Sequence, residues 1–546
     1  TVGPHGWTRR EGMRVAPNDG SDTATAGTAA DPDAGSGHGR LVLAAMICAV
    51  AMTFIDQTIV AIAAPQLQNE LSLSTEQVQW VINGYLLSLA ALFAFGGRLS
   101  DIAGHRKIVV LGVIVFAGSS TMCGFTPTGS LAAPWIIGFR VLQGAGAALM
   151  YPAALAIVVR AFPLERRGQA MAIFFGVAGG LTALGPLAGG YLTQWTWRSI
   201  FWINVPVAIA ALVLTAIAKP DDDRTPAPLD LRGLVLIVAG MALAVLGLQQ
   251  SGSWGWSSPA TIGCIAAGVV LLAVFVLVET RTADPLIRME IFRTRAFAVQ
   301  NAVLFVAMAV FIPVFFFAST YAQVSLGYSS SDAGLYLLTF FAGFAPGVQI
   351  GGKLLDTRGA KPPVVVGCAI AAVGFALWGS SLTTLSQGSQ WYWIVLAGVG
   401  MGLMVGPSNT DAVNRAPRTS YGEATGITQT VRNFGSSIGL AVLGTVLISS
   451  MSTNVVANLE AAGVPSPVAT EIAGDFSLGG GPPPGQATDT PEAQAIESAI
   501  EQSFAESSQT LWYLMAGTMA VAFVIALVGL QSGRQEHVVD ALPGGG

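Results

Sequence analysis

Long apolar runs separated by short polar segments make up most of this chain. Most of the runs contain about twenty residues, which is the length that an α-helix needs to cross the hydrocarbon core of a bilayer. Six runs precede a polar linker, two follow it, and six more complete the pattern. We therefore predict fourteen spanning helices, at 41–63, 78–97, 107–126, 133–157, 168–190, 199–218, 232–250, 259–279, 296–322, 332–352, 363–383, 391–411, 421–447 and 509–530.

The order of these runs divides the chain into two halves around an inserted pair of helices. Residues 41–218 are expected to form a first six-helix bundle, and residues 296–530 a second one. Between them, residues 219–295 supply the linker, the two additional helices and a charged connector. The expected fold is therefore an all-α polytopic membrane protein.

The termini and the longest loop differ from the rest in composition. Residues 1–40 and 531–546 contain no apolar run, and we expect two tails, the first of them disordered. The expected loop 449–508 carries eight acidic residues and no Lys or Arg. Most cations fall in segments on the other side of the membrane, so the positive-inside rule places both termini in the cytoplasm. We expect a multi-pass protein of the cell inner (cytoplasmic) membrane.

Composition agrees with a membrane protein and offers little support for other classes. The chain is 52% hydrophobic and only 10% charged, whereas soluble domains are about a quarter charged. All four cysteines lie in apolar runs without metal-ligand spacing, and no phosphate-binding loop or catalytic cluster stands out. We therefore expect no enzyme, no cofactor, no metal and no nucleic-acid partner, and we expect a monomer.

One charged turn interrupts the apolar background and occurs twice. Gly96–Lys107, GGRLSDIAGHRK, is echoed by Gly351–Lys361, GGKLLDTRGAK, and we expect each to be a tight turn between spans, with glycines allowing the reversal. The turn resembles the signature loop of the major facilitator superfamily, in which it acts as a conformational latch. Asp101 could accept a hydrogen bond from Arg106 or lie at a helix N-terminus. The alternative is that these charges only set topology. The resemblance assigns the latch to Gly97, Arg98, Asp101, Gly104, Arg106, Lys107 and Asp356.

Asp56 is the only carboxylate well inside a predicted span. A buried acid is costly unless it is protonated or paired, so it usually marks an ion or substrate path. The surrounding FIDQTIVAIAAP resembles the first-helix motif of the fourteen-helix drug:proton antiporter branch of the superfamily. This resemblance implies a proton-coupling role for Asp56. A purely structural carboxylate is the alternative.

Arg140, in FRVLQGAGAA, resembles the Arg of the superfamily's fourth-helix motif, with Gln143 beside it. A rise of about 1.5 Å per residue places Asp56 and Arg140 at similar depth in the membrane. Whether they touch depends on the rotation of each helix. We therefore expect either an Asp56–Arg140 proton-coupling pair or an arginine bonded to backbone carbonyls.

The fifth predicted span has glycines four residues apart, a spacing that allows close approach of helices. It resembles the Gly-Pro motif found in exporters of the superfamily, and the resemblance assigns an antiporter motif to Gly185, Pro186, Gly189 and Gly190. Pro186 is expected to bend the helix or open it locally. A generic packing face is the alternative.

Arg432 also lies deep in a span, with no matching acid in its own half. It binds carbonyls, or it lines the cavity and meets an anionic group of the substrate. Aromatic residues crowd another span, where they serve packing or a drug-binding wall. The expected substrate cavity comprises Gln143, Phe305, Phe311, Phe315 and Arg432.

These features together predict a proton-coupled antiporter that exports amphipathic drugs by alternating access, with membrane lipids as its surroundings and the proton gradient as its energy source. Two alternatives remain. The protein could export an endogenous lipid, siderophore or antibiotic, or it could be a transport-incompetent sensor or scaffold.

Overall fold

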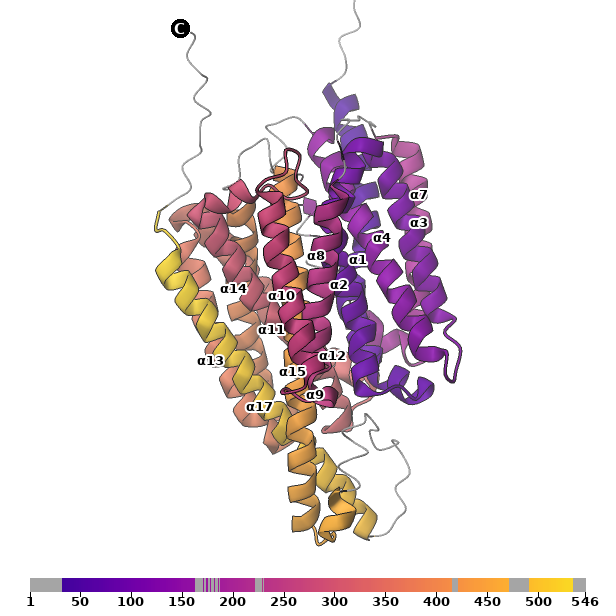
Figure 1. The fold of residues 1–546 in the computed structure, drawn as a ribbon, viewed down its shortest axis with the longest axis vertical. Helices are drawn as coiled ribbons and strands as arrows, with labels where there is room; N and C mark the ends of the chain where they lie inside the picture. The colour runs from indigo at the N-terminus through magenta and orange to yellow at the C-terminus, as the bar shows by residue number, and fades with distance from the viewer. Residues whose placement is uncertain are drawn as a thin grey trace, which may run out of the picture.

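A computed structural model describes residues 32–162, 187–220, 230–414, 421–470 and 491–533, together with Pro228 and single positions between 170 and 185. Within these residues, thirteen helices are long and apolar enough to cross a membrane, and most of them run side by side (Figure 1). The predicted fifth span, 168–190, falls largely outside the described residues. The all-helical architecture expected from the apolar runs is confirmed.

The first bundle is built around one central helix, α4 (Ala132–Ala161). Its elements are α1 (Pro32–Leu71), α2 (Thr75–Ala103), α3 (His105–Gly124), α4 (Ala132–Ala161), α6 (Ser199–Trp202) and α7 (Asn204–Ala218). Helix α4 packs against α1, α2 and α3, while α7 packs against α1 and α3. Helix α1 begins earlier than predicted, so the part of the expected tail 1–40 from Pro32 onward is helical.

The second bundle repeats the packing of the first. Its elements are α11 (Arg295–Val324), α12 (Ser330–Arg358), α13 (Lys361–Ser381), α14 (Trp391–Asn414), α15 (Tyr421–Ala461) and α17 (Pro491–Gly529). Helix α14 packs against α12 and α13, as α4 packs against α2 and α3. The bundles meet mainly along two helix pairs, α1 with α11 and α2 with α15.

The inserted pair flanks this junction. Helices α8 (Leu231–Gln249) and α10 (Pro259–Glu279) are joined by the short α9 (Ser251–Trp254). Helix α8 packs against both α2 and α15, and α10 packs mainly against α8. Most side chains of α10 are exposed and apolar, as expected for a helix whose outer surface faces lipid.

The glycine pairs of the repeated charged turn do not reverse the chain, contrary to our expectation. Gly96 and Gly97 lie inside α2, which continues to Ala103, and the break comes only at Gly104, with φ of 104°. The second copy behaves in the same way, because α12 continues to Arg358 and ends at Gly359, with φ of 84°. Only Gly104 and Gly359 use the backbone freedom of glycine here.

Gly96 instead allows two helices to pack closely. A Cβ at Gly96 would overlap the carbonyl oxygen of Ala148 on α4. In the second bundle, a Cβ at Gly351 would lie 2.7 Å from the carbonyl oxygen of Leu403 on α14. Small residues at a helix interface let backbones approach in this way. The repeated glycines therefore fix the α2–α4 and α12–α14 contacts.

The described parts of the expected loop 449–508 are largely helical. Helix α15 continues to Ala461 and α17 begins at Pro491, so both helices extend beyond the bundles (Figure 1). The two extensions contact each other, with Asn454 Nδ2 donating to Ser507 Oγ at 3.0 Å and Asn458 Nδ2 to Ser503 Oγ at 3.0 Å. Residues 491–508 of this expected loop therefore form the start of the last helix.

We call the end of the molecule that carries the extensions of α15 and α17 the loop end, and the end that carries Gly104 the turn end. Hydrogen bonds join the two bundles at the loop end. Gln66 Nε2 donates to Ser330 Oγ at 2.8 Å, and Gln323 Nε2 donates to the carbonyl oxygen of Ile62 at 3.1 Å. Ser331 Oγ donates to the carbonyl oxygen of Gly190 at 2.9 Å. These contacts hold the bundles together at that end.

The close packing at Gly96 predicts a difference between two neighbouring substitutions. We expect Gly96→Ala to lower the free energy of unfolding by roughly 1–3 kcal/mol, because the added methyl group overlaps α4. Gly97→Ala is the matched control, since its nearest contact is Pro152 Cβ at 3.7 Å and alanine favours helix. Thermal unfolding of both purified variants in detergent measures the difference. Equal stability would contradict the packing role.

Candidate functional site

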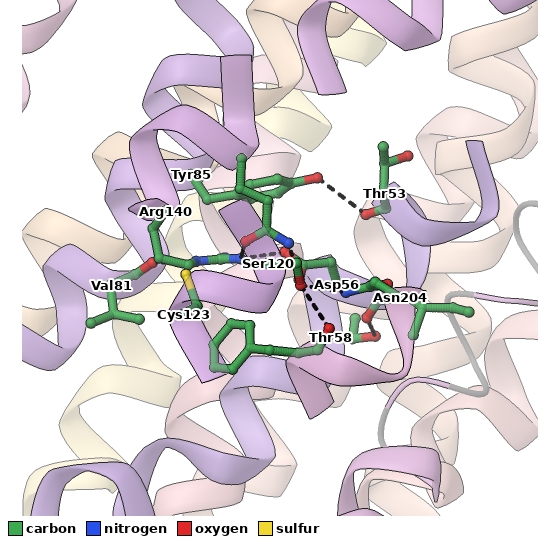
Figure 2. Close-up of polar contacts among 12 residues, drawn as sticks. Thr53, Asp56, Thr58, Val81, Tyr85, Ser120, Cys123, Arg140 and Asn204 are labelled. Atoms are coloured by element: carbon green, nitrogen blue, oxygen red, sulfur yellow. Dashed lines mark hydrogen bonds and ion pairs between the residues drawn. The ribbon is translucent and has the colours of Figure 1, made fainter. Parts of the chain in front are cut away.

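A buried ion pair joins α1 to α4. Asp56 and Arg140 are each only 1% exposed, and Arg140 Nη1 donates to Asp56 Oδ2 at 2.5 Å. Figure 2 shows the guanidinium directed toward the carboxylate. The structure thus brings together the two residues whose contact the sequence could not determine.

Two further groups complete the hydrogen bonds of the pair. Gln143 Nε2 donates to Asp56 Oδ1 at 2.9 Å, and its Oε1 accepts from Arg140 Nη1 at 2.8 Å. Arg140 Nε donates to the carbonyl oxygen of Val81 on α2 at 2.8 Å. Both carboxylate oxygens are therefore occupied by donors, which is how a charge is tolerated away from water. Gln143 belongs to this cluster.

Aromatic rings enclose the guanidinium of Arg140. Its carbon lies 4.4 Å from the ring centroid of Tyr85 and 6.0 Å from that of Phe201. Tyr85 is itself held in place, because its hydroxyl donates to the carbonyl oxygen of Thr53 at 3.3 Å. A cation over an aromatic face is stabilised most when both are desolvated. The site is buried from solvent, and Arg140 contacts a carboxylate, an amide, a backbone carbonyl and aromatic rings.

The predicted antiporter glycines pack against α1 next to Asp56. A Cβ at Gly185 would overlap Thr58 Oγ1, and a Cβ at Gly189 would lie 3.0 Å from Ile59. A Cβ at Gly190 would lie 2.7 Å from the carbonyl oxygen of Ser330 in the second bundle. These glycines therefore lie against α1 and, at the loop end, against α12. Pro186 lies outside the described residues.

A cavity opens between the two bundles on the other face of α1. Asp56 does not line it, whereas its neighbours Phe54 and Gln57 do. The remaining walls come from α2, α4, α11 and α15: Leu89, Phe93, Tyr151, Met308, Ile312, Gln429, Arg432, Asn433 and Ser436. Its free volume of about 10 Å³ holds roughly one water molecule, so a drug-sized molecule can enter only if the walls separate.

A short hydrogen-bonded chain crosses this cavity from one bundle to the other. Gln429 Nε2 on α15 donates to the hydroxyl of Tyr151 on α4 at 3.1 Å, and its Oε1 accepts from Arg432 Nη1 at 3.2 Å. Arg432 is thus placed at the cavity, as one of the two predictions for it required. Tyr151 and Gln429 were missed from the sequence.

The predicted phenylalanines do not line this cavity. Phe311 and Phe315 pack against the aromatic side chains of α12, and Phe315 stacks on Phe341 with centroids 5.2 Å apart. Phe305 lies 6.1 Å from Phe434 of α15. The aromatic wall comes instead from Phe54, Phe93 and Tyr151 of the first bundle. The wall formed by α15 could have been predicted from the sequence, because the polar positions 429, 432, 433 and 436 have the spacing of one helix face.

The residues of the charged turn lie at the turn end, well away from the ion pair. Arg98 Nη2 lies 3.9 Å from Asp284 Oδ1, in the connector that follows α10. Asp101 Oδ1 lies 3.6 Å from Nε2 of the buried His105, a partner that we had not considered. Lys107 and Asp356 are exposed. Arg98 thus contacts the connector that leads to the second bundle.

Across the described ranges, no group of three or more His, Cys, Asp or Glu side chains is placed to hold a metal ion. The site's chemistry is that of one carboxylate, one guanidinium and one amide in a dry helical bundle.

Comparisons with known proteins agree with one another. Residues 46–440 match the family model described as Major Facilitator Superfamily. A tetracenomycin C resistance and export protein of Streptomyces glaucescens is 37% identical, over 92% of this chain and 93% of that protein. The cephamycin export protein CmcT of Amycolatopsis lactamdurans is 35% identical, over 73% and 83% respectively. Among solved structures, an inward-facing, occupied bacterial homolog of the human lysosomal transporter Spinster superposes with a TM-score of 0.59 at 18% identity, covering 89% of this chain and 96% of that one.

The buried ion pair predicts a strong energetic coupling. We expect Asp56→Asn and Arg140→Gln each to lower the free energy of unfolding by roughly 3–5 kcal/mol, because each leaves a buried partner unpaired. The double variant should lose at least about 1 kcal/mol less than the sum of the two. Thermal unfolding of the purified single and double variants measures the coupling.

The ion pair between Arg198 and Glu70, whose side chains are 20% and 46% exposed, provides the more exposed control. Its cycle with Arg198→Gln and Glu70→Gln should give a smaller coupling, since exposed pairs contribute about 1 kcal/mol or less. Additive losses for Asp56 and Arg140 would show that the pair contributes nothing as a pair.

Proposed function

This chain belongs to the major facilitator superfamily, and we propose that it exports drug-like amphipathic molecules across the cytoplasmic membrane in exchange for protons. It is a multi-pass membrane protein, and its curated relatives are antibiotic and multidrug export proteins of the same family. The observation that carries the proton coupling is the buried Asp56–Arg140–Gln143 cluster, an ionisable site in the middle of an apolar bundle.

Asp56 is proposed to be the proton-exchanging group. When Asp56 is ionised, Arg140 neutralises it and Gln143 donates to its second oxygen. When it gains a proton, the attraction to Arg140 falls and α1 is held less firmly against α4. Because α1 also carries Phe54 and Gln57 at the cavity, a change at Asp56 is transmitted to the substrate site through the helix itself. Proton and substrate then need not touch.

Alternating access would require opposite changes at the two ends. The loop-end hydrogen bonds, including Gln66–Ser330 and Gln323–Ile62, must break for release on that side. At the turn end, the Arg98–Asp284 contact is placed to restrain the same rocking motion. We assign the turn end and both termini to the cytoplasm from the distribution of cations. A substrate site at the interface of the repeats agrees with this motion.

An antibiotic is the cargo that the relatives' names favour, since two of them export tetracenomycin C and cephamycin. Export of another endogenous compound uses the same machinery and differs only in the cavity. A transport-incompetent sensor with this fold would bind substrate without moving protons. Substrate-triggered proton movement in energised vesicles separates the sensor from both transporters.

The proposed coupling predicts the behaviour of Asp56→Asn in transport. We expect inverted membrane vesicles with this variant to lose proton-driven accumulation of substrate, because position 56 can no longer exchange a proton. Facilitated, downhill movement of the same substrate should persist. Fluorescent-substrate uptake before and after addition of an uncoupler measures both activities.

Asp332→Asn is the matched control, since this exposed carboxylate starts α12, where its Oδ2 accepts from Ser329 Oγ at 2.7 Å, away from the cluster. It should keep wild-type uptake and uncoupler sensitivity. Wild-type gradient dependence in Asp56→Asn would remove Asp56 from the coupling mechanism. Wild-type uptake that survives the uncoupler and stops on ATP depletion would remove the proton gradient as the energy source.

The turn predicts a second kind of defect. Asp101→Asn should leave substrate affinity unchanged and slow turnover several-fold, because it alters a contact with His105 at the turn end and no cavity residue. Binding by purified protein and turnover in proteoliposomes test the two parts. Normal turnover in a well-folded Asp101→Asn protein would show that the turn sets topology only.

A further inference from the structure

Arg432 differs from Arg140 in how its charge is satisfied. Arg140 has a carboxylate, an amide and a backbone carbonyl as acceptors, with a tyrosine ring against its face. Arg432 has one hydrogen bond in the described part of the chain, from Nη1 to Gln429, and its buried Nε has no partner. No carboxylate of the described residues forms an ion pair with it. Arg432 is half-buried, an arginine always carries its charge, and a partly desolvated cation without a counter-ion is costly.

Among the residues that the structure describes, none of those lining the cavity around Arg432 is an acid that could balance it. Its polar side chains are neutral amides and hydroxyls, namely Gln57, Tyr151, Gln429, Asn433 and Ser436. Three of these lie on the same face of α15 as Arg432. Asn433 Nδ2 donates to the backbone carbonyl oxygen of Gln429 at 2.8 Å. The net charge of the cavity wall is therefore positive. A cationic cargo would be repelled here unless it brought its own counter-ion.

The opposite wall is aromatic. Phe54 and Phe93 each lie against Tyr151, with ring centroids 5.6 Å and 5.4 Å apart. These rings belong to the first bundle, while Arg432 belongs to the second. A ligand between the bundles would thus meet flat apolar surfaces on one side and a guanidinium on the other. A guanidinium forms its strongest hydrogen bonds with anionic oxygens, such as those of a carboxylate.

We propose that the cavity selects anionic aromatic amphiphiles, with a carboxylate or ionised phenol paired to Arg432 and a planar ring system against Phe54, Phe93 and Tyr151. This selectivity rests on the proposed export function and names the cargo class of the same site. Binding of the anion would satisfy the unpartnered Nε and compete with Gln429 for the guanidinium. Since Gln429 also bonds Tyr151, the anion would loosen the hydrogen-bonded chain that joins the bundles across the cavity.

A matched pair of probes tests the charge preference. Anthraquinone-2-carboxylate and anthraquinone-2-carboxamide share a planar skeleton and nearly the same shape, and only the first is charged. Their affinities for purified protein in lipid nanodiscs are measured by quenching of tryptophan fluorescence. We expect the carboxylate to bind at least about tenfold more tightly to the wild type, the gain typical of a hydrogen bond to a charged group.

Substitutions assign this preference to one residue. Arg432→Gln should bring the two affinities within about twofold of each other, and Arg432→Lys should retain part of the preference because it keeps the charge. Arg198→Gln, at the loop-end ion pair with Glu70, removes a cation outside the cavity and should keep the full preference. Equal wild-type affinities, no measurable binding of the carboxylate, or a preference that survives Arg432→Gln would each overturn the proposal.

The binding assay needs no proton gradient, so its outcome is independent of the proposed export function. If the charge preference is found but substrate addition moves no protons in proteoliposomes, the cargo class stands and the antiport mechanism fails. If proton-driven export occurs without the charge preference, the antiport mechanism stands and the proposed cargo class fails. If the Arg432→Gln protein does not fold, the affinities of the two probes for the wild type and for Arg432→Lys test the charge preference instead.

Discussion

A carboxylate inside an apolar bundle has to be neutralised within the protein, because no water is available to solvate it. In this chain Asp56 meets that requirement through Arg140 and Gln143, both on α4. The pair forms only if α1, α2 and α4 approach closely, since Val81 and Tyr85 of α2 hold the guanidinium from the other side. Glycines at the helix contacts permit this approach, with Gly96 and Gly144 between α2 and α4 and Gly185 against α1. The repeated close contacts in the second bundle follow the same rule.

The ion pair and the cavity lie on different faces of α1. Phe54 and Gln57 line the cavity, while Asp56 between them faces α4. Helix α4 likewise carries both Arg140 and the cavity residue Tyr151. In the proposed mechanism, proton binding and substrate binding therefore act on the same two helices without sharing an atom. Our account of coupling is mechanical, because a weaker Asp56–Arg140 attraction lets α1 move relative to α4 and changes the shape of the cavity between the bundles.

Much of the fold was predictable from the sequence because spanning helices obey a length rule. The range of α10 was predicted to the residue, whereas α1 and α15 extend beyond their apolar runs, since packing outside the membrane also stabilises helix. The depth of Asp56 and Arg140 could be estimated from the helical rise, but their contact depends on helix rotation. The aromatic wall was misplaced for a related reason. Phe311 and Phe315 were predicted to line the cavity, but α12 packs against α11 and buries them among its own aromatic side chains.

In the proposed mechanism, substrate binding changes the protonation of Asp56 although the substrate does not contact the Asp56 side chain. Infrared difference spectroscopy of the purified protein measures this directly, because a buried protonated carboxyl group has its own C=O stretching band. At a pH low enough to protonate Asp56, we expect substrate addition to remove this band from the wild type, and we expect no such change in Asp56→Asn. A substrate-induced spectrum with no carboxyl band, or with the same band in Asp56→Asn, would contradict it.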